Sequence, residues 1–238
     1  MVIYGINPVV EALRAGTVVE VHIVRRSEGR LADVERLAAT HGVRVVRTSP
    51  EALAAFTGTS QHQGVGARLD APRRRWTLND LTDGVAAPLI VVLDGVEDPQ
   101  NVGAILRTAE AAGVSGIVRQ ERRSAALNAA AAKASAGALA HARVVDVVNI
   151  ARALEDLKGR GVWTVGLAGD GAQAYDTVDY RPPTAVVLGS EGEGLRRLVR
   201  ERCDFLVRIP MHGQVESLNV SVAAGVVLYE ALRQRSAR

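Results

Sequence analysis

Apolar residues along the chain switch repeatedly between a helical and a strand spacing. Within residues 1–70, helix patterns alternate with strand patterns at 7–16, 18–24, 31–42, 43–47, 49–56 and 62–69. Asn7 and Ser49 each precede a proline at the expected first position of a helix, so both are predicted N-caps. These segments predict a small α/β domain over residues 1–70.

Residues 71–87 are polar and have little periodicity, which predicts an interdomain linker with about one helical turn. Short β-branched runs then recur over residues 88–238, at 88–96, 116–120, 142–148, 162–168, 184–189 and 205–210. Helical patterns separate these runs, and they include 101–113, an Ala-rich stretch at 124–140, and 149–161. The alternation predicts a second α/β domain with a parallel sheet covered on both faces.

Composition narrows the class of protein. The apolar content of 47% is ample for a packed core, and the single cysteine, Cys203, excludes an internal disulfide framework. No signal peptide is evident, and no apolar segment is long enough to span a bilayer, so we expect a cytoplasmic protein without a membrane partner.

The charge pattern favours contacts with phosphate groups. The net charge is only +3, yet the pI is about 9.4 and nearly all the basic residues are arginine. Aromatic residues make up 3% of the chain, which argues against a base-stacking platform. Arg122 and Arg123 follow a predicted strand and are candidate RNA contacts.

Three loops after predicted strands carry unusual polar residues, and ligands of open parallel sheets bind beyond the carboxyl ends of the strands. The first loop is in "LDGVEDPQNVGAILRTAEAAG", residues 93–113. Asn101 is expected to cap the following helix, and Arg107 lies on its polar side. A local ion pair between Arg107 and Glu110 is the simple structural alternative.

The second loop, in "VVLGSEGEGLRRL", contains Gly189, Gly192 and Gly194. A phosphate-binding loop is disfavoured because Glu191 and Glu193 would repel a pyrophosphate, and the spacing does not match the dinucleotide fingerprint. A ligand with positive charge or a ribose remains compatible with this turn.

The third loop, in "RIPMHGQVESLNVSVAAG", places Ser217, Asn219 and Ser221 at the start of an apolar helical run. Ser217 alone is explained by capping. Asn219 and Ser221 are mediocre helix formers inside the expected first turns. The cluster therefore leaves two interpretations open, helix capping and a ligand site.

Together, the three loops resemble, nearly residue for residue, the signature motifs of the SpoU (TrmH) family of RNA 2'-O-methyltransferases, which belongs to the SPOUT superfamily. The segments "IYGINPVVEALRAG" and "HQGVGA" look like the small RNA-binding domain of the ribosomal RNA ribose methyltransferases in that family. The resemblance covers essentially the whole chain. It implies a deep trefoil knot at the C-terminal end of the sheet, with S-adenosylmethionine (AdoMet) bound in the knotted loops.

The resemblance also assigns a role to each motif residue. The residues expected to surround AdoMet are Leu167, Gly189, Ile209, Met211 and Leu218.

By the same resemblance, Arg107 would stabilise negative charge that develops on the 2'-oxygen, with the proton acceptor left open. Asn101 would hold the substrate and orient Arg107. Glu191 would fix the cofactor loop or position Arg107, and Ser217 and Asn219 would anchor that arrangement.

The remaining candidates are less specific. His62 is expected to contact RNA or to close a turn, and Cys203 is expected to be an inert small residue. The five histidines have no ligand-like spacing, so no metal is expected. The last predicted helix, 217–235, is apolar almost all round, and the resemblance also implies a homodimer, so a second subunit is the expected cover.

The sequence therefore predicts AdoMet-dependent ribose 2'-O-methylation of RNA. The expected target is a guanosine of large-subunit (23S) ribosomal RNA, presented as RNA or as a ribosome assembly intermediate. One alternative is a transfer-RNA methylase of the same family. The others are a non-catalytic RNA-binding protein with a relic AdoMet pocket and a nicotinamide-dependent oxidoreductase.

Overall fold

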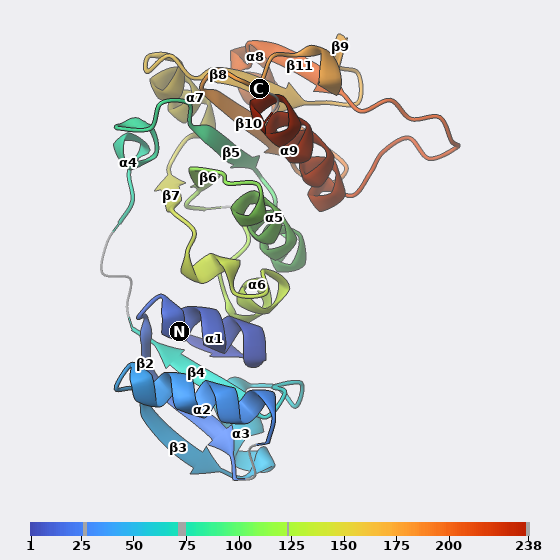
Figure 1. Cartoon of the computed structure of the whole chain (residues 1–238). Helices are drawn as coiled ribbons and strands as arrows, with labels where there is room; N and C mark the ends of the chain where they lie inside the picture. The colour runs from blue at the N-terminus through green and yellow to red at the C-terminus, as the bar shows by residue number, and fades with distance from the viewer. Residues whose placement is uncertain (26–27, 71–74, 123, 237–238) are drawn as a thin grey trace. The chain divides into compact units, whose positions relative to one another are not determined.

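The computed structural model describes residues 1–25, 28–70, 75–122 and 124–236, and it separates the chain into two compact units (Figure 1). The first unit comprises Met1–Arg74 and Ala126–His141, and the second comprises Arg75–Ala125 and Ala142–Arg238. The predicted domains, 1–70 and 88–238, assign residues 126–141 to the second domain, whereas the structure groups them with the first unit. Residues 126–141 pack with the first unit although the second unit surrounds them in sequence.

The first unit contains a four-stranded mixed sheet in the order β1-β4-β2-β3. Strand β4 is antiparallel to β1 and β2, whereas β2 and β3 are parallel. Its elements are β1 (Val2–Tyr4), α1 (Ile6–Arg14), β2 (Val18–Val24), α2 (Arg30–Thr40), β3 (Arg44–Thr48), α3 (Pro50–Thr57), β4 (Val65–Leu69), α6 (Ala129–Ala134) and the 3-10 turn η1 (Ala138–Ala140).

One of the two predicted caps in this unit is confirmed. The Ser49 hydroxyl accepts a hydrogen bond from the Ala52 backbone N–H at 3.2 Å, with Pro50 at the first helical position. The other is wrong, because α1 already begins at Ile6 after Gly5. Asn7 instead accepts a hydrogen bond from Arg30, which links α1 to the start of α2.

The Ala-rich stretch forms a much shorter helix than its composition predicts. Asn128 caps α6 by accepting hydrogen bonds from two backbone N–H groups. The helix stops because Ala136 and Gly137 both have positive φ, 51° and 104°. A Cβ on Gly137 would lie 2.6 Å from the Glu11 side chain, so this turn packs directly on α1.

The second unit is built on a seven-stranded sheet in the order β7-β6-β5-β10-β8-β11-β9. Every pairing described in it is parallel, and all six residues of both β5 and β10 are buried. The strands are β5 (Leu89–Asp94), β6 (Gly116–Gln120), β7 (Val144–Val147), β8 (Trp163–Leu167), β9 (Gln173–Ala174), β10 (Thr184–Gly189) and β11 (Phe205–Arg208).

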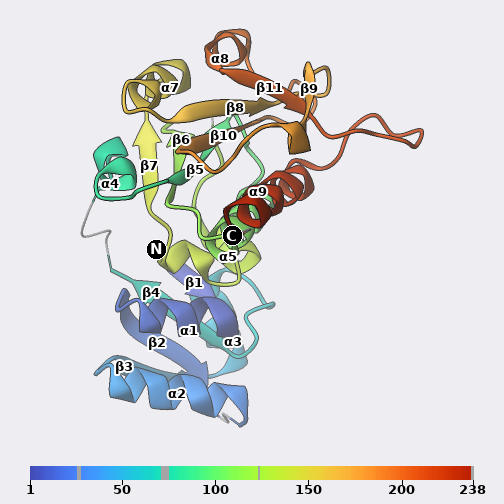
Figure 2. The ribbon, with the colours of Figure 1, turned by 45° about the horizontal axis from the view of Figure 1, so that its top comes forward.

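Helices cover both faces of this sheet, as the apolar runs predict. Figure 2 shows α7 and α8 on one face and α5 and α9 on the other. On the first face, Leu154 and Leu157 of α7 pack with Ile90 and Val187 of the central strands. The helical elements are α4 (Leu78–Thr82), α5 (Pro99–Ala111), α7 (Ile150–Lys158), η2 (Tyr175–Thr177), α8 (Arg197–Arg202) and α9 (Val220–Ser236). The trefoil knot stays a prediction.

Two helix starts differ from expectation near the ends of the strands. Asp98, not Asn101, caps α5, because its carboxylate accepts the Gln100 backbone N–H at 3.0 Å and Pro99 follows it. Helix α9 begins at Val220, three residues later than predicted, with the Asn219 side chain accepting the Ser221 backbone N–H at 2.9 Å. The Asn101 side chain is therefore not the cap of α5. Ser217 and Leu218 lie before α9 and not within it.

No helix within the described ranges is long and apolar enough to cross a membrane.

Arg235 ties the end of α9 to the starts of the two central strands. Its guanidinium donates hydrogen bonds to the carbonyl oxygens of Ala87 at 2.6 Å, Tyr180 at 2.8 Å and Pro182 at 2.9 Å. Burial lowers the pKa of Arg235, because the surrounding protein solvates its charge less well than water does.

We expect Arg235→Ala to lower the free energy of unfolding by about 2–4 kcal/mol, because it leaves several carbonyl groups without their donor. The matched control is Arg197→Ala, which removes a mostly exposed pair with Glu201 and should cost under about 1 kcal/mol. Chemical denaturation of both variants measures the difference, and equal stabilities would show that the Arg235 contacts do not stabilise the fold.

Candidate active site

A glycine-rich turn folds tightly against the end of β10. A Cβ on Gly189 would lie 2.2 Å from the backbone carbon of Gly194, so no larger residue fits there. Ser190 and Gly194 exchange backbone hydrogen bonds of 3.1 and 3.0 Å across the turn, and Gly192 and Gly194 have positive φ. The glycines are therefore required by the turn itself, before any ligand is considered.

A buried ion pair fastens this turn to the neighbouring strand. Asp94, the last residue of β5, is fully buried and accepts hydrogen bonds from the Arg196 backbone N–H at 2.9 Å and from Arg196 Nε at 2.6 Å. A terminal nitrogen of the same guanidinium completes the pair. Because the carboxylate and its donors satisfy one another, the burial of this charge is compensated.

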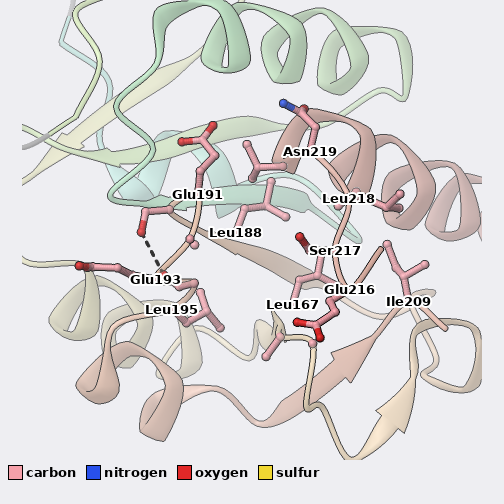
Figure 3. A pocket seen from close by; sticks show the side chains of 18 of the residues that line it. Leu167, Leu188, Glu191, Glu193, Leu195, Ile209, Glu216, Ser217, Leu218 and Asn219 are labelled. Carbon is pink, nitrogen blue, oxygen red and sulfur yellow. Dashed lines mark hydrogen bonds between the residues drawn. The ribbon is translucent and has the colours of Figure 1, made fainter. Parts of the chain in front are cut away.

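The turn forms one wall of a cavity of about 540 Å³ beyond the carboxyl ends of β8, β10 and β11 (Figure 3). The other walls are residues 167–170, at the end of β8 and directly after it, together with residues between β11 and α9 and in the first turn of α9. All five residues predicted to surround AdoMet line this cavity: Leu167, Gly189, Ile209, Met211 and Leu218. Their assignment to the cofactor stays a prediction, but the fold brings them together from three separate loops.

Carboxylates outnumber cationic groups around the cavity. Asp170, Glu191, Glu193 and Glu216 line it, against the single arginine Arg200. Arg200 is already neutralised, because it donates to both oxygens of Asp170 at 2.7 and 2.8 Å. These hydrogen bonds lower the pKa of Asp170. The remaining acidic excess suits a cationic ligand and opposes a polyphosphate.

Sequence reasoning missed three of these wall residues, Asp170, Arg200 and Glu216. Asp170 follows the strand that ends at Leu167, so its place after a strand was the available signal. Arg200 lies on α8, and only the folded structure brings it to Asp170.

A short chain of side-chain hydrogen bonds joins one residue from each motif. Asn219 donates to the Asn101 side-chain oxygen at 3.0 Å, and Asn101 in turn donates to the Glu191 carboxylate. Glu191 and Asn219 also line the cavity, whereas Asn101 does not. Helices α5 and α9 run in the same direction here, because Asn101 meets Asn219 and Thr108 lies near Gly225.

The two remaining catalytic candidates, Ser217 and Arg107, have different surroundings. Ser217 lines the cavity, and Figure 3 shows its side chain between Leu188 and Glu216. Arg107 is exposed on α5, outside the cavity lining. Within the described part of the chain it has no hydrogen bond or ion pair, so the local pair with Glu110 is not formed.

Comparison with protein families decides the identity. Residues 88–229 match the model described as the SpoU rRNA Methylase family, and residues 2–75 match the model described as RNA 2'-O ribose methyltransferase substrate binding. The chain belongs to the SpoU rRNA methylase family. This confirms the family resemblance and the α/β fold class, and it makes the protein an RNA 2'-O-methyltransferase.

Individual relatives of this SpoU methylase cover nearly all of it. The chain is 48% identical, over 98% of its length and 96% of the relative's, to a protein of Xanthomonas campestris named 23S rRNA (guanosine-2'-O-)-methyltransferase RlmB. The solved structure of the SpoU methyltransferase AviRb from Streptomyces viridochromogenes, in complex with AdoMet, has a TM-score of 0.84 and 26% identity. It covers 99% of this chain and 90% of AviRb.

A transfer-RNA relative matches a smaller share of the chain. The structure described as a TrmH/SpoU tRNA modifying enzyme of A. aeolicus is 34% identical, with a TM-score of 0.58. It covers 66% of this SpoU methylase and 80% of its own chain.

The predicted RNA contacts of this SpoU methylase have different surroundings. Arg122 is exposed in the second unit, whereas Arg123 lies outside the described residues. His62 is only 8% exposed, and its Nδ1 accepts the Gly64 backbone N–H at 3.0 Å. The structure therefore gives His62 the turn-closing role, and the RNA contact at this position stays a prediction with little side-chain surface available.

Two further observations concern chemistry outside the motifs of this SpoU methylase. Burial raises the pKa of Cys203 to about 12, which keeps the thiol protonated and unreactive, as expected. Over the ranges that the structure describes, no three or more His, Cys, Asp or Glu side chains are grouped to hold a metal ion.

Proposed function

We propose that this SpoU methylase transfers a methyl group from AdoMet to the ribose 2'-hydroxyl of a guanosine in 23S ribosomal RNA. The cofactor is AdoMet, and the observation that carries the site assignment is the acidic cavity at three strand ends, whose lining residues Glu191 and Asn219 are both hydrogen-bonded to Asn101. The guanosine and the 23S RNA follow from the name of a relative that aligns over 98% of this chain. We place the reaction in the cytoplasm, on RNA or a ribosome assembly intermediate.

The residues of the cavity fit the cofactor chemically. Bound AdoMet supplies a methyl group activated by a sulfonium, together with an ammonium group, a carboxylate, an adenine and a ribose, so its net charge is positive. Leu167, Ile209 and Leu218 provide apolar walls, and the carboxylates of the cavity favour the two positive charges. The backbone of the tight turn after Gly189 offers hydrogen-bonding groups to polar atoms of the adenosine.

We propose that Arg107 assists the transfer. A ribose 2'-hydroxyl is a poor nucleophile, and negative charge develops on its oxygen as the new bond forms. The unpaired guanidinium of Arg107 stabilises that charge, and Asn101, on the same helix, positions the ribose or its phosphate. The hydrogen bonds that join Asn101 to Glu191 and to Asn219 fix the start of α5 relative to the glycine-rich turn and the start of α9.

Three alternative functions are each less consistent with particular observations. The pyrophosphate of a nicotinamide dinucleotide would be repelled by the carboxylates of Glu193 and Glu216 in the cavity. A non-catalytic protein would have no need for an intact chain of motif residues beside an unpaired Arg107. The A. aeolicus tRNA enzyme covers only 66% of this chain, whereas the substrate-binding model covers residues 2–75, so we propose that the first unit recruits ribosomal RNA.

The target is tested by mapping ribose methylation in total RNA from cells with and without the gene. We expect one guanosine of 23S RNA to lose its 2'-O-methyl group when the gene is deleted. A lost methyl group in transfer RNA, or no change in any RNA, would contradict the proposal.

Arg107→Ala should lower turnover by roughly two to three orders of magnitude, as for loss of an oxyanion donor, with little change in AdoMet affinity. Arg107→Lys should recover only part of the rate, because an ammonium lacks the planar pair of donors. Single-turnover methyl transfer on saturating RNA provides the measurement. The control is Arg152→Ala, which removes an exposed arginine of α7 and should leave the rate of transfer unchanged. Near-normal transfer by Arg107→Ala would remove Arg107 from the mechanism.

We further propose that the protein acts as a homodimer. Val222 and Tyr229 of α9 lie two helical turns apart, and their side chains are 53% and 51% exposed. Val215 and Leu218, in the preceding loop, are also exposed. Apolar side chains that continue from a loop along one side of a helix are typical of an interface between subunits.

Light scattering at micromolar concentration should give twice the mass of one chain for the wild-type protein. Val222→Asp should shift the protein toward the monomer, because it places an unpaired charge in the apolar surface. Leu198→Asp is the control, since Leu198 is 52% exposed on α8, on the other face of the sheet. A monomeric wild-type protein would contradict the proposed homodimer.

A further inference from the structure

A second cavity, of about 430 Å³, shares the glycine-rich turn with the first. Ser190, Glu191 and Glu193 line both cavities, so the turn separates two adjacent spaces of the second unit. The further walls of the second cavity include Asp94, Glu97 and Arg196. Its volume lies within the range of sites for small ligands, roughly 300–1,000 Å³.

One cationic group of this second cavity, Arg196, is held in a fixed orientation. The buried Asp94 carboxylate binds Nε and one terminal nitrogen of Arg196, which fixes the plane of the guanidinium. The Arg196 side chain is still 42% exposed, and its Nη1 makes no bond to any residue that the structure describes. Arg196 therefore presents an oriented donor at the cavity.

Glu193 presents the complementary acceptors. It is exposed, and it forms no hydrogen bond or ion pair within the described ranges. Figure 3 shows its side chain extending from the turn away from Ser217, Leu218 and Ile209, the far wall of the cofactor cavity. A carboxylate has two acceptor oxygens and no donor, so it pairs best with two neighbouring N–H groups.

We infer that the second cavity receives the guanine base of the target nucleotide, with Glu193 accepting from N1–H and the 2-amino group and Arg196 donating to O6. This inference rests on the proposed function. The base is attached to the ribose whose 2'-hydroxyl reaches the cofactor, so it must lie next to the cofactor cavity. Along its edge guanine presents two donors and then acceptors, which is the order that Glu193 and Arg196 complement.

The same arrangement discriminates against adenine. Adenine has an acceptor at N1 and lacks a 2-amino group, so its edge would place a lone pair against the Glu193 carboxylate. Its 6-amino group would face the Arg196 donor. Both contacts are repulsive, and they leave desolvated polar groups unpaired, which is an effective way to reject a competing substrate.

The test uses the full-length protein and a 23S RNA fragment with guanosine, inosine or adenosine at the methylated position. For the wild-type enzyme, kcat/KM should fall about tenfold from guanosine to inosine, which lacks only the 2-amino group. Glu193→Ala and Glu193→Gln should both lower kcat/KM for guanosine and bring the guanosine-to-inosine ratio to within about twofold. AdoMet affinity, measured by calorimetry, is a separate readout, because Glu193 also lines the cofactor cavity and loss of its charge there would weaken AdoMet binding without changing the guanosine-to-inosine ratio. Glu201→Gln is the control and should keep the wild-type ratio, because Glu201 lies on α8 outside both cavities.

Several results would overturn the inference. One is an unchanged guanosine-to-inosine ratio in both Glu193 variants, and another is loss of the ratio in Glu97→Ala instead. A large loss of AdoMet affinity with an unchanged ratio would assign the second cavity to the cofactor. If the wild-type enzyme transferred no methyl group to the guanosine fragment, the proposed function itself would fail, which separates that outcome from the others.

Discussion

The buried carboxylate of Asp94 holds together the parts of this molecule that carry chemistry. It closes the central strand β5 and binds both the backbone and the guanidinium of Arg196, which follows the glycine-rich turn. This glycine-rich turn separates the two cavities. It also carries Glu191, which accepts a hydrogen bond from Asn101 of α5. A charge buried at this point is tolerated only with its partner in place, so the position of the turn is strongly determined.

The alternating apolar pattern predicted most of the fold because it reports burial directly. Strands β5 and β10 are apolar on both faces, and the structure buries both faces. The Ser49 cap is a local signal, and it is confirmed. Asn101 was misassigned because Asp98 and Asn101 are both good caps, and Pro99 decides between them by taking the first helical position. Nothing in the composition of the Ala-rich stretch indicated that Ala136 and Gly137 would end its helix.

The candidate site was predictable to the extent that its residues follow strands in the sequence. The motif loops bring Gly189, Ile209 and Leu218 to one cavity, because the carboxyl ends of parallel strands lie at the same edge of the sheet. The partnerships across the site were not predictable. Asp170 with Arg200, and Asp94 with Arg196, join residues whose proximity depends on the order β10-β8-β11 and β5-β10 in the sheet.

The packing of residues 126–141 with the first unit has a consequence for synthesis of the protein on the ribosome. The chain passes between the two units three times, after residues 74, 125 and 141. The first unit therefore lacks part of its core, including Ala132, until translation has passed well into the catalytic half. A gene fragment that ends at residue 75 therefore encodes the matched substrate-binding segment without residues 126–141, which contribute to the core of the first unit.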